Sequence, residues 1–210
     1  MFRGMIAKVC QTGLRCERFE QAGTGAAGLE LCRAMLPDVV LLDLDLPDFY
    51  GLDLIPGLRA ASPQTKIIVL SAHAEDYVIH RCLQLEVDGF VDKNDEPEEI
   101  IVKAIESVLA GKTYLSSVVS RVRSFMREDP KAFTKLLSDR EQQLIGFFGR
   151  GMSEAEIASK TGISPATVVR HQRNIMGKLG IHTAADLRQY AIVRGFSPPP
   201  RMGPQEAARH

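Results

Sequence analysis

Short apolar runs alternate with amphipathic stretches over the first half of the chain. Two runs, at residues 39–42 and 67–70, are rich in Val, Ile and Leu, are short enough for strands, and lack polar interruptions, as in strands buried on both faces; a third, shorter stretch, Gly89-Phe-Val-Asp-Lys93, ends on a lysine. We expect strands at residues 39–43, 66–71 and 89–93. Between and around them, apolar positions recur at helical spacing. We expect helices at residues 26–36, 52–61, 75–85 and 98–110. This alternation predicts an α/β fold with a parallel sheet and helices on both faces.

The first 22 residues give weaker patterns. Residues 2–12 fit a short amphipathic helix that turns Phe2, Ile6 and Val9 toward a core. Residues 16–22 fit an edge strand, and Thr24-Gly25 fits a turn before the next helix.

The pattern changes after residue 113. Residues 114–136 are rich in Arg and Lys and contain Pro130, so we interpret them as a linker with some helix. Residues 137–196 predict a compact all-α domain of four helices, whose starts are marked by capping residues. The expected N-caps are Ser138, Ser153, Ser164 before Pro165, and Thr183. Residues 197–210 are rich in Pro and Gly and are expected to be a disordered tail.

Charge separates the same two halves. Residues 1–113 carry 11 Lys and Arg against 18 Asp and Glu, a net charge of −7, whereas residues 114–210 carry 15 against 8, a net charge of +7. A basic second half favours a polyanionic partner. No apolar stretch is long enough to span a bilayer and no signal peptide is visible, so we expect a cytoplasmic protein without a membrane partner. The cysteines show no C-x-x-C spacing, and we interpret Cys10, Cys16, Cys32 and Cys82 as reduced core thiols.

Three strand ends carry candidate chemistry. The expected strands end in Asp43, Ser71 and Lys93, and the carboxyl ends of parallel strands share one edge of a sheet. A carboxylate there can accept a phosphoryl group, while a hydroxyl and an ammonium neutralise phosphoryl oxygens and a divalent metal holds further charge. Each residue alone is weak evidence, but the three together predict a phosphoryl site.

Residues 1–113 resemble the receiver domain of two-component response regulators, which has a flavodoxin-like fold. The resemblance lies in Asp43 with Pro47 and Gly51 at the D-x-x-x-P-x-x-x-G spacing, followed by Ser71 and Lys93. It implies that Asp43 is the phospho-acceptor, Ser71 the switch hydroxyl and Phe90 the aromatic residue that rotates on phosphorylation. It also implies that Asp45 gives its backbone carbonyl to the metal, and that Asp45 and His73 tune the lifetime of the phosphoryl group.

The resemblance has one gap. Receivers begin with a strand whose acidic pair holds Mg²⁺, and counting back from Asp43 places that strand and pair before Met1. The remaining Mg²⁺ ligands would be Asp43 and the Asp45 carbonyl. Either the start lies upstream of Met1, or this is a degenerate receiver in which Asp45 and Asp48 partly replace the lost carboxylates.

The basic half contains a helix-turn-helix pattern. A helix at 153–160, a turn containing Gly162 and a helix at 165–179 fit the motif. On the second helix Val168, Ile175 and Leu179 face a core, while Arg170, Arg173 and Asn174 lie together on the opposite side. Arg and Asn can pair with guanine and adenine edges, so this face predicts binding to double-stranded DNA. Thr167 and Lys178 are placed to hold phosphates.

Residues 137–181 resemble the LuxR-type, or NarL/FixJ-type, DNA-binding domain. The matching stretches are Leu137-Ser-Asp-Arg-Glu141, Gly151 to Ala158, Gly162 to Val168 and His171 to Ile181. Val169 stands where a lysine is usual, which moves the expected groove contact to Arg170, and we interpret His171 as a packing residue. The helix at 183–193 resembles the dimer-forming helix, with Leu187, Tyr190 and Ala191 as candidate contacts, and implies a homodimer.

Together the two resemblances predict a transcription factor that a partner histidine kinase switches by phosphorylating Asp43, rather than a turnover enzyme. A phosphorylation-independent DNA-binding regulator is the alternative. Asp43-x-Asp45, Ser71 and Lys93 also imitate haloacid-dehalogenase-like phosphatases. That family needs a further acidic pair and usually a cap domain, and no segment here fits a cap.

Overall fold

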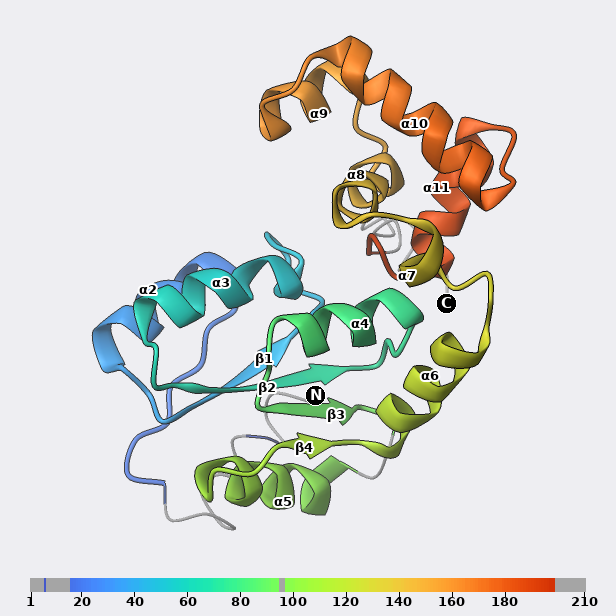
Figure 1. Cartoon of the computed structure of the whole chain (residues 1–210). Coiled ribbons are helices and arrows are strands. Elements are labelled where there is room, and N and C mark those ends of the chain that lie inside the picture. Colours follow the sequence, from blue (N-terminus) through green and yellow to red (C-terminus); the bar gives the residue numbers. More distant parts are fainter. Residues whose placement is uncertain (1–5, 7–15, 95–96, 199–210) are drawn as a thin grey trace, which may run out of the picture. The chain divides into compact units, whose positions relative to one another are not determined.

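Residues 6, 16–94 and 97–198 are described by the computed structural model of the chain (Figure 1). The chain divides into two compact units, Met1–Ser124 and Phe125–His210. In the first unit, strands alternate with helices as the hydrophobic pattern predicts. The elements are α2 (Gly25–Met35), β1 (Val39–Asp43), α3 (Gly51–Ala61), β2 (Lys66–Ser71), α4 (Asp76–Gln84), β3 (Gly89–Asp92), α5 (Pro97–Leu109) and β4 (Tyr114–Leu115).

The four described strands form one parallel sheet in the order β1-β2-β3-β4. Asp43 pairs with Leu70, and Ser71 pairs with Asp92, so the ends of β1, β2 and β3 lie at one edge of the sheet. The three expected strands and the helices between them are therefore confirmed, with ends that agree to within two residues.

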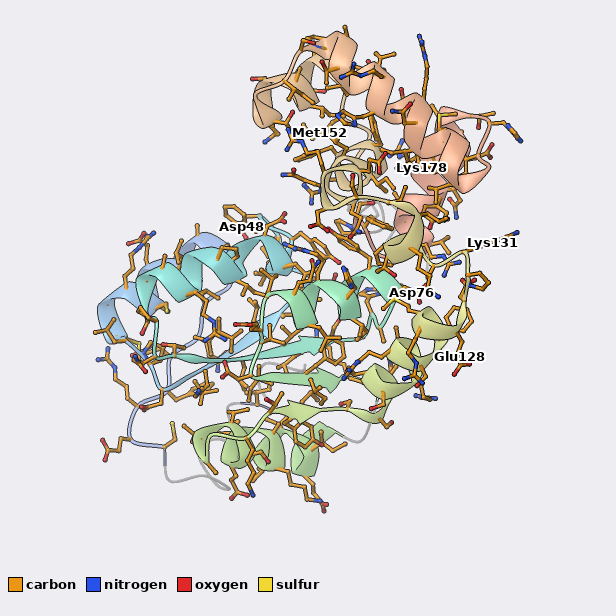
Figure 2. The ribbon with its side chains drawn as sticks, in the orientation of Figure 1. Asp48, Asp76, Glu128, Lys131, Met152 and Lys178 are labelled. Atoms are coloured by element: carbon orange, nitrogen blue, oxygen red, sulfur yellow. The ribbon has the colours of Figure 1, made fainter. Side chains whose placement is uncertain are left out.

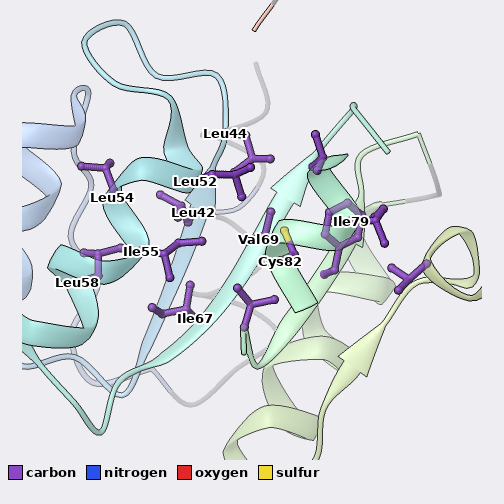
Figure 3. Packing of buried hydrophobic residues seen from close by; sticks show 14 of the residues in the cluster. Leu42, Leu44, Leu52, Leu54, Ile55, Leu58, Ile67, Val69, Ile79 and Cys82 are labelled. Atoms are coloured by element: carbon purple, nitrogen blue, oxygen red, sulfur yellow. The ribbon is translucent and has the colours of Figure 1, made fainter. Parts of the chain in front are cut away.

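Alternate residues of the central strand point to opposite faces of the sheet. Ile67 and Val69 pack with apolar residues of α3 and α4, and Figure 3 shows this cluster around Leu42, Ile55 and Ile79. Ile68 and Leu70 pack with α5 on the other face. Both sets of strand residues are essentially inaccessible to solvent, which explains why the run from Ile67 to Leu70 contains no polar residue.

The region after α5 holds more structure than its sequence indicates. Tyr114–Leu115 forms β4, which pairs with β3, and the helix α6 (Ser117–Glu128) follows. Val119 of α6 is buried in the same core as Phe90. The helical part of the expected linker 114–136 is thus present. The sequence does not predict β4, because two residues are too few to show an alternation of apolar and polar positions.

The expected edge strand at 16–22 is wrong. These residues form no strand, and most of them are exposed, with Arg18 and Glu20 forming an ion pair at 3.6 Å. A strand needs a neighbour to satisfy its backbone groups, and no described strand lies beside this segment. The expected helix 2–12 lies outside the described residues except for Ile6, which is helical and buried.

The second unit is all helical. Its elements are the end of α6, α7 (Phe133–Leu136), α8 (Asp139–Gly149), α9 (Glu154–Thr161), α10 (Pro165–Leu179) and α11 (Ala184–Val193). The four expected N-caps are confirmed, since each hydroxyl accepts a backbone N–H three residues ahead. The caps are Ser138, Ser153, Ser164 and Thr183.

The second unit has its own apolar core. Leu144, Ile175 and Leu187, from three different helices, are inaccessible to solvent. Phe133 and Phe196 meet edge to face with ring centroids 5.0 Å apart. Ser197, expected to begin a disordered tail, is buried, and residues 199–210 of that tail lie outside the described residues.

Two of the expected core thiols are confirmed. Cys32 and Cys82 are buried and unpaired, and burial raises the pKa of the Cys82 thiol to about 12. Cys16 is exposed, which corrects its assignment to the core, and Cys10 lies outside the described residues. Within the described ranges, none of the helices is both long and apolar enough to cross a membrane.

Candidate phospho-acceptor site and DNA interface

Asp43 and Lys93 meet at the carboxyl edge of the sheet. The Lys93 ammonium lies 2.7 Å from an Asp43 carboxylate oxygen. The Lys93 side chain is 16% exposed and that of Asp43 is 39% exposed. A mostly buried cation therefore holds a carboxylate that solvent and a substrate can still reach.

Ser71 lies on the strand between them and is completely buried. Its hydroxyl oxygen accepts the backbone N–H of His73 at 2.9 Å, and its carbonyl accepts the N–H of Lys93 at 2.9 Å. The structure thus brings Asp43, Ser71 and Lys93 to the ends of three adjacent strands, as their positions in the sequence predict.

A histidine connects the loops after β1 and β2. His73 Nε2 lies 3.4 Å from a carboxylate oxygen of Asp45, and Nδ1 lies 3.1 Å from Glu75. Asp45 in turn donates its backbone N–H to Asp43 Oδ1 at 3.0 Å. When its ring is protonated, His73 forms ion pairs that tie the Asp43 loop to the start of α4. The contact with Glu75 was not predicted.

Asp48 has a different role from the one expected. Its two carboxylate oxygens accept the backbone N–H groups of Gly25 and Ala26, at 2.7 and 2.9 Å, at the start of α2 (Figure 2). The hydrogen bond from Ala26 is the main reason that the pKa of Asp48 is lowered. Asp48 therefore stabilises the start of α2 through both of its carboxylate oxygens.

Phe90 is fully buried in β3 and belongs to the core shared with α3 and α4. Its carbonyl accepts the backbone N–H of Ser116, the residue just before α6. This hydrogen bond links the expected switch strand to the beginning of the next helix.

The helix-turn-helix is formed by α9 and α10. α9 ends at Gly162, whose φ of +69° is a left-handed conformation that favours glycine. Val168 and Ile175 are completely buried and Leu179 is partly buried, so these three residues place α10 on the core as expected.

The expected base-reading face of α10 is open to solvent. Arg170, Arg173 and Asn174 are exposed, and Val169 is half-buried beside them. Thr167 is half-buried and its hydroxyl lies 2.9 Å from that of Ser164, within the helix cap.

Lys178 is not a free cation. Its ammonium lies 2.7 Å from Glu141 Oε2, and the Glu141 side chain is only 6% exposed. Glu141 also accepts the N–H of Ser138 at 2.8 Å in the capping box of α8. Lys178 therefore joins the end of α10 to the start of α8, which its sequence position did not reveal.

The expected dimer contacts on α11 need correction. Leu187 and Ala191 are completely buried inside their own unit and cannot face a second subunit. Tyr190 is half-buried and packs on Phe196 with ring centroids 6.2 Å apart. An apolar stripe on a helix looks the same in sequence whether it packs within a domain or between subunits.

Comparison with known proteins agrees with this geometry. Residues 1–105 match the response regulator receiver domain, and residues 135–191 match the bacterial regulatory proteins of the luxR family. The transcriptional regulatory protein MctR of Rhizobium johnstonii is 37% identical over 83% of this chain and 80% of its own length. This chain belongs to the LuxR-type response regulators.

Other response regulators are similar over a comparable share of the chain. UvrY of Escherichia coli O6:H1 is 30% identical over 84% of this chain and 82% of its own length. The structure of RcsB from Salmonella enterica, bound to a promoter, aligns with a TM-score of 0.61 over 90% of this chain and 91% of that chain. That alignment is 24% identical in sequence and supports the receiver-like and helical folds.

The response-regulator family implies Mg²⁺ at the receiver site, so we tested the donors in this chain against it. Mg²⁺ prefers about six oxygen ligands in octahedral geometry. The described residues provide one carboxylate at the site, that of Asp43, together with the Asp45 carbonyl, and they contain no cluster of three or more acidic, His or Cys side chains that could hold an ion. These donors are too few for the ion, and we derive no step through it.

Proposed function

We propose that this response regulator accepts a phosphoryl group on Asp43 from a partner histidine kinase and binds duplex DNA through α10. The ion pair between Asp43 and Lys93, at the open edge of the sheet, is the observation that carries the first part. The second part is supported by the solvent-exposed cluster of Arg170, Arg173 and Asn174. An RcsB structure that is 25% identical, with a TM-score of 0.50, is a complex with DNA.

The acceptor chemistry follows from the three strand ends. An Asp43 oxygen attacks the phosphorus of the phosphohistidine, the P–N bond breaks, and the histidine nitrogen leaves with the electron pair. The Lys93 ammonium then pairs with a phosphoryl oxygen. Ser71 would turn its hydroxyl toward the new group, and its hydrogen bond from the His73 N–H would weaken.

Acetyl phosphate tests this step, because it can donate a phosphoryl group without a kinase. With Mg²⁺ present, we expect intact-mass spectrometry to show one added phosphoryl group on the wild-type chain and none on Asp43→Asn. A wild-type chain that gains no phosphoryl group but still binds DNA would support the second candidate function, phosphorylation-independent regulation.

The DNA contact is tested at Arg173. Arg173→Ala should lose about 1–3 kcal/mol of binding to a duplex selected from a random-sequence pool, and should discriminate less among base changes at one position. Lys112→Ala removes an exposed cation from the first unit and is the control. Unchanged affinity and sequence preference for Arg173→Ala would count against Arg173 as a base reader. Thr167, Val169, Arg170, Asn174 and Lys178 remain the other proposed contacts, with Lys178 already paired to Glu141.

We place the proposed homodimer contact on the exposed side of α11. Ala185, Gln189 and Val193 recur at four-residue spacing and are exposed, and Val193 is 58% exposed. The isolated apolar surface of Val193 suits an interface that is repeated on two subunits. Val193→Asp should shift sedimentation toward the monomer, whereas an unchanged dimer would place the interface elsewhere.

A further inference from the structure

The helix α6 presents arginines that have no acidic partner. Arg121, Arg123 and Arg127 are exposed, and none of them has an ion pair or a side-chain hydrogen bond within the described part of the chain. The only acidic residue of α6 is Glu128, its last residue (Figure 2).

Cations on the receiver helices are arranged differently. Arg33 pairs with Glu30 on α2, and Lys103 pairs with Glu99 on α5, each one helical turn away. These pairs neutralise the surface of the first unit locally. On α6 the residues three positions before Arg123 and Arg127 are Ser120 and Ser124, so no acidic side chain neutralises either arginine from that position.

The unpaired charge is ordered along one face. Arg123 and Arg127 are one turn apart, and Ser120 and Ser124 lie between and beside them on the same stripe. Val119 and Met126, four residues before and three residues after Arg123, are buried and fix the edge of the helix beside this stripe. Arg121 lies about half a turn around the helix from Arg123. It is therefore on the side of α6 that carries Phe125, and not on this stripe.

The end of this helix is held in place. The ammonium of Lys135 donates to the carbonyls of Arg127 and Asp129, at 2.6 and 2.8 Å. A cation at a helix C-terminus interacts favourably with the negative end of the helix dipole, which reduces fraying of the last turn. Arg127 is therefore presented from an ordered turn, which reduces the entropy lost when its side chain is bound.

We propose that Arg123 and Arg127, aided by the hydroxyls of Ser120 and Ser124, form a second DNA contact that binds phosphates without reading bases. A guanidinium pairs with two phosphate oxygens at once, and hydroxyls donate to the same groups. The apolar neighbours of this stripe, Val119 and Met126, are buried and cannot enter a lipid layer. The proposal rests on the proposed DNA-binding function. The second contact would add affinity that does not depend on the DNA sequence.

The double variant Arg123→Gln/Arg127→Gln tests the proposal in the full chain. Each phosphate contact contributes about 0.9 to the slope of log affinity against log salt concentration. Fluorescence anisotropy over a KCl series should therefore show a slope shallower by about 1.8 for two lost contacts. The loss should be equal for a mixed-sequence duplex and for a selected duplex. Arg123→Lys/Arg127→Lys should keep most of the slope.

Arg121→Gln is the matched control, because it removes the same charge from another side of the same helix. An unchanged slope in the double variant, or an equal loss in Arg121→Gln, would overturn the proposal. Loss of binding to anionic phospholipid vesicles with DNA binding intact would also overturn it. If Arg173→Ala reduces sequence preference while the double variant behaves as wild type, only this inference fails. If the wild-type chain itself binds no duplex in this assay, the proposed DNA-binding function fails as well.

Discussion

Gly51 lies against the backbone that carries the acceptor. A Cβ atom at this position would lie 2.5 Å from the carbonyl oxygen of Asp43 and 2.7 Å from the Cα of Leu44. Gly51 also donates its N–H to the Leu44 carbonyl at 2.9 Å. The glycine of the receiver motif is therefore required by a close approach of two backbone segments.

Gly51→Ala should destabilise the first unit by about 1–3 kcal/mol, because neither backbone segment can move without displacing the Asp43 loop. Urea unfolding followed by circular dichroism measures the change. Gly57→Ala is the matched control on the same helix, since its Cβ would meet only Leu29 side-chain atoms, at 3.6 Å. That variant should gain about 0.5–1 kcal/mol from higher helix propensity. Equal effects of the two substitutions would contradict this account of Gly51.

Single residues differ in how far their sequence predicts their contacts. Asp43 and Lys93 could be placed together because parallel strands end at one edge, and their ion pair follows. The hydrogen bonds between Asp48 and the start of α2 could not be predicted. A carboxylate in a loop belongs to no repeating pattern, so its sequence position does not indicate which residue it contacts. The contact between Glu141 and Lys178 could not be predicted for the same reason, since the two residues are 37 positions apart in the sequence.

At the scale of elements, one charged pair fixes the orientation of α8 and α10. Burial alone would raise the pKa of Glu141, but the hydrogen bonds from Lys178 and Ser138 outweigh burial and lower it. A carboxyl group that is more acidic in the folded state stabilises the fold fully above its ordinary pKa of about 4.3. This stabilisation is lost as the pH falls through the folded-state pKa.

Lys178→Met should destabilise the second unit by roughly 1–3 kcal/mol, because it leaves the buried Glu141 carboxylate without its cation. Urea midpoints should show that the double variant Glu141→Gln/Lys178→Met loses less than the sum of the two single variants. Glu156→Gln is the control, since Glu156 occupies the same capping position in α9 but is exposed and has no lysine partner at hydrogen-bonding distance. Strict additivity in the double variant would show that the two side chains act independently.

Elements were predictable where many residues repeat one pattern. The uninterrupted apolar runs predict β1 and β2, and the hydroxyl caps predict the starts of α8 to α11, as the structure confirms. The two-residue strand β4 was missed because pairing with β3, rather than its own sequence, makes it a strand. The prediction of a strand at residues 16–22 was wrong for the opposite reason. Their sequence suits a strand, but no described strand lies beside them to pair with.

At the scale of the molecule, the two units have separate cores and opposite charges. The first unit is built around a sheet and the second around packed helices. We expect two transitions in differential scanning calorimetry, because each unit has its own core and should unfold cooperatively as that core is disrupted. Gly51→Ala should lower the temperature of one transition and Lys178→Met that of the other. A shift of both transitions by either variant would show that the units unfold together.

The strand β4 has a consequence for the exchange of amide hydrogens. It attaches to the sheet through the N–H groups of Tyr114 and Ser116, which donate to Asp88 and Phe90. A two-residue edge strand opens at a fraction of the free energy needed for global unfolding. Its opening would free Phe90's carbonyl on one side and the first turn of α6 on the other. Deuterium uptake at Tyr114 and Ser116 would therefore measure how often the receiver releases the segment that leads out of it.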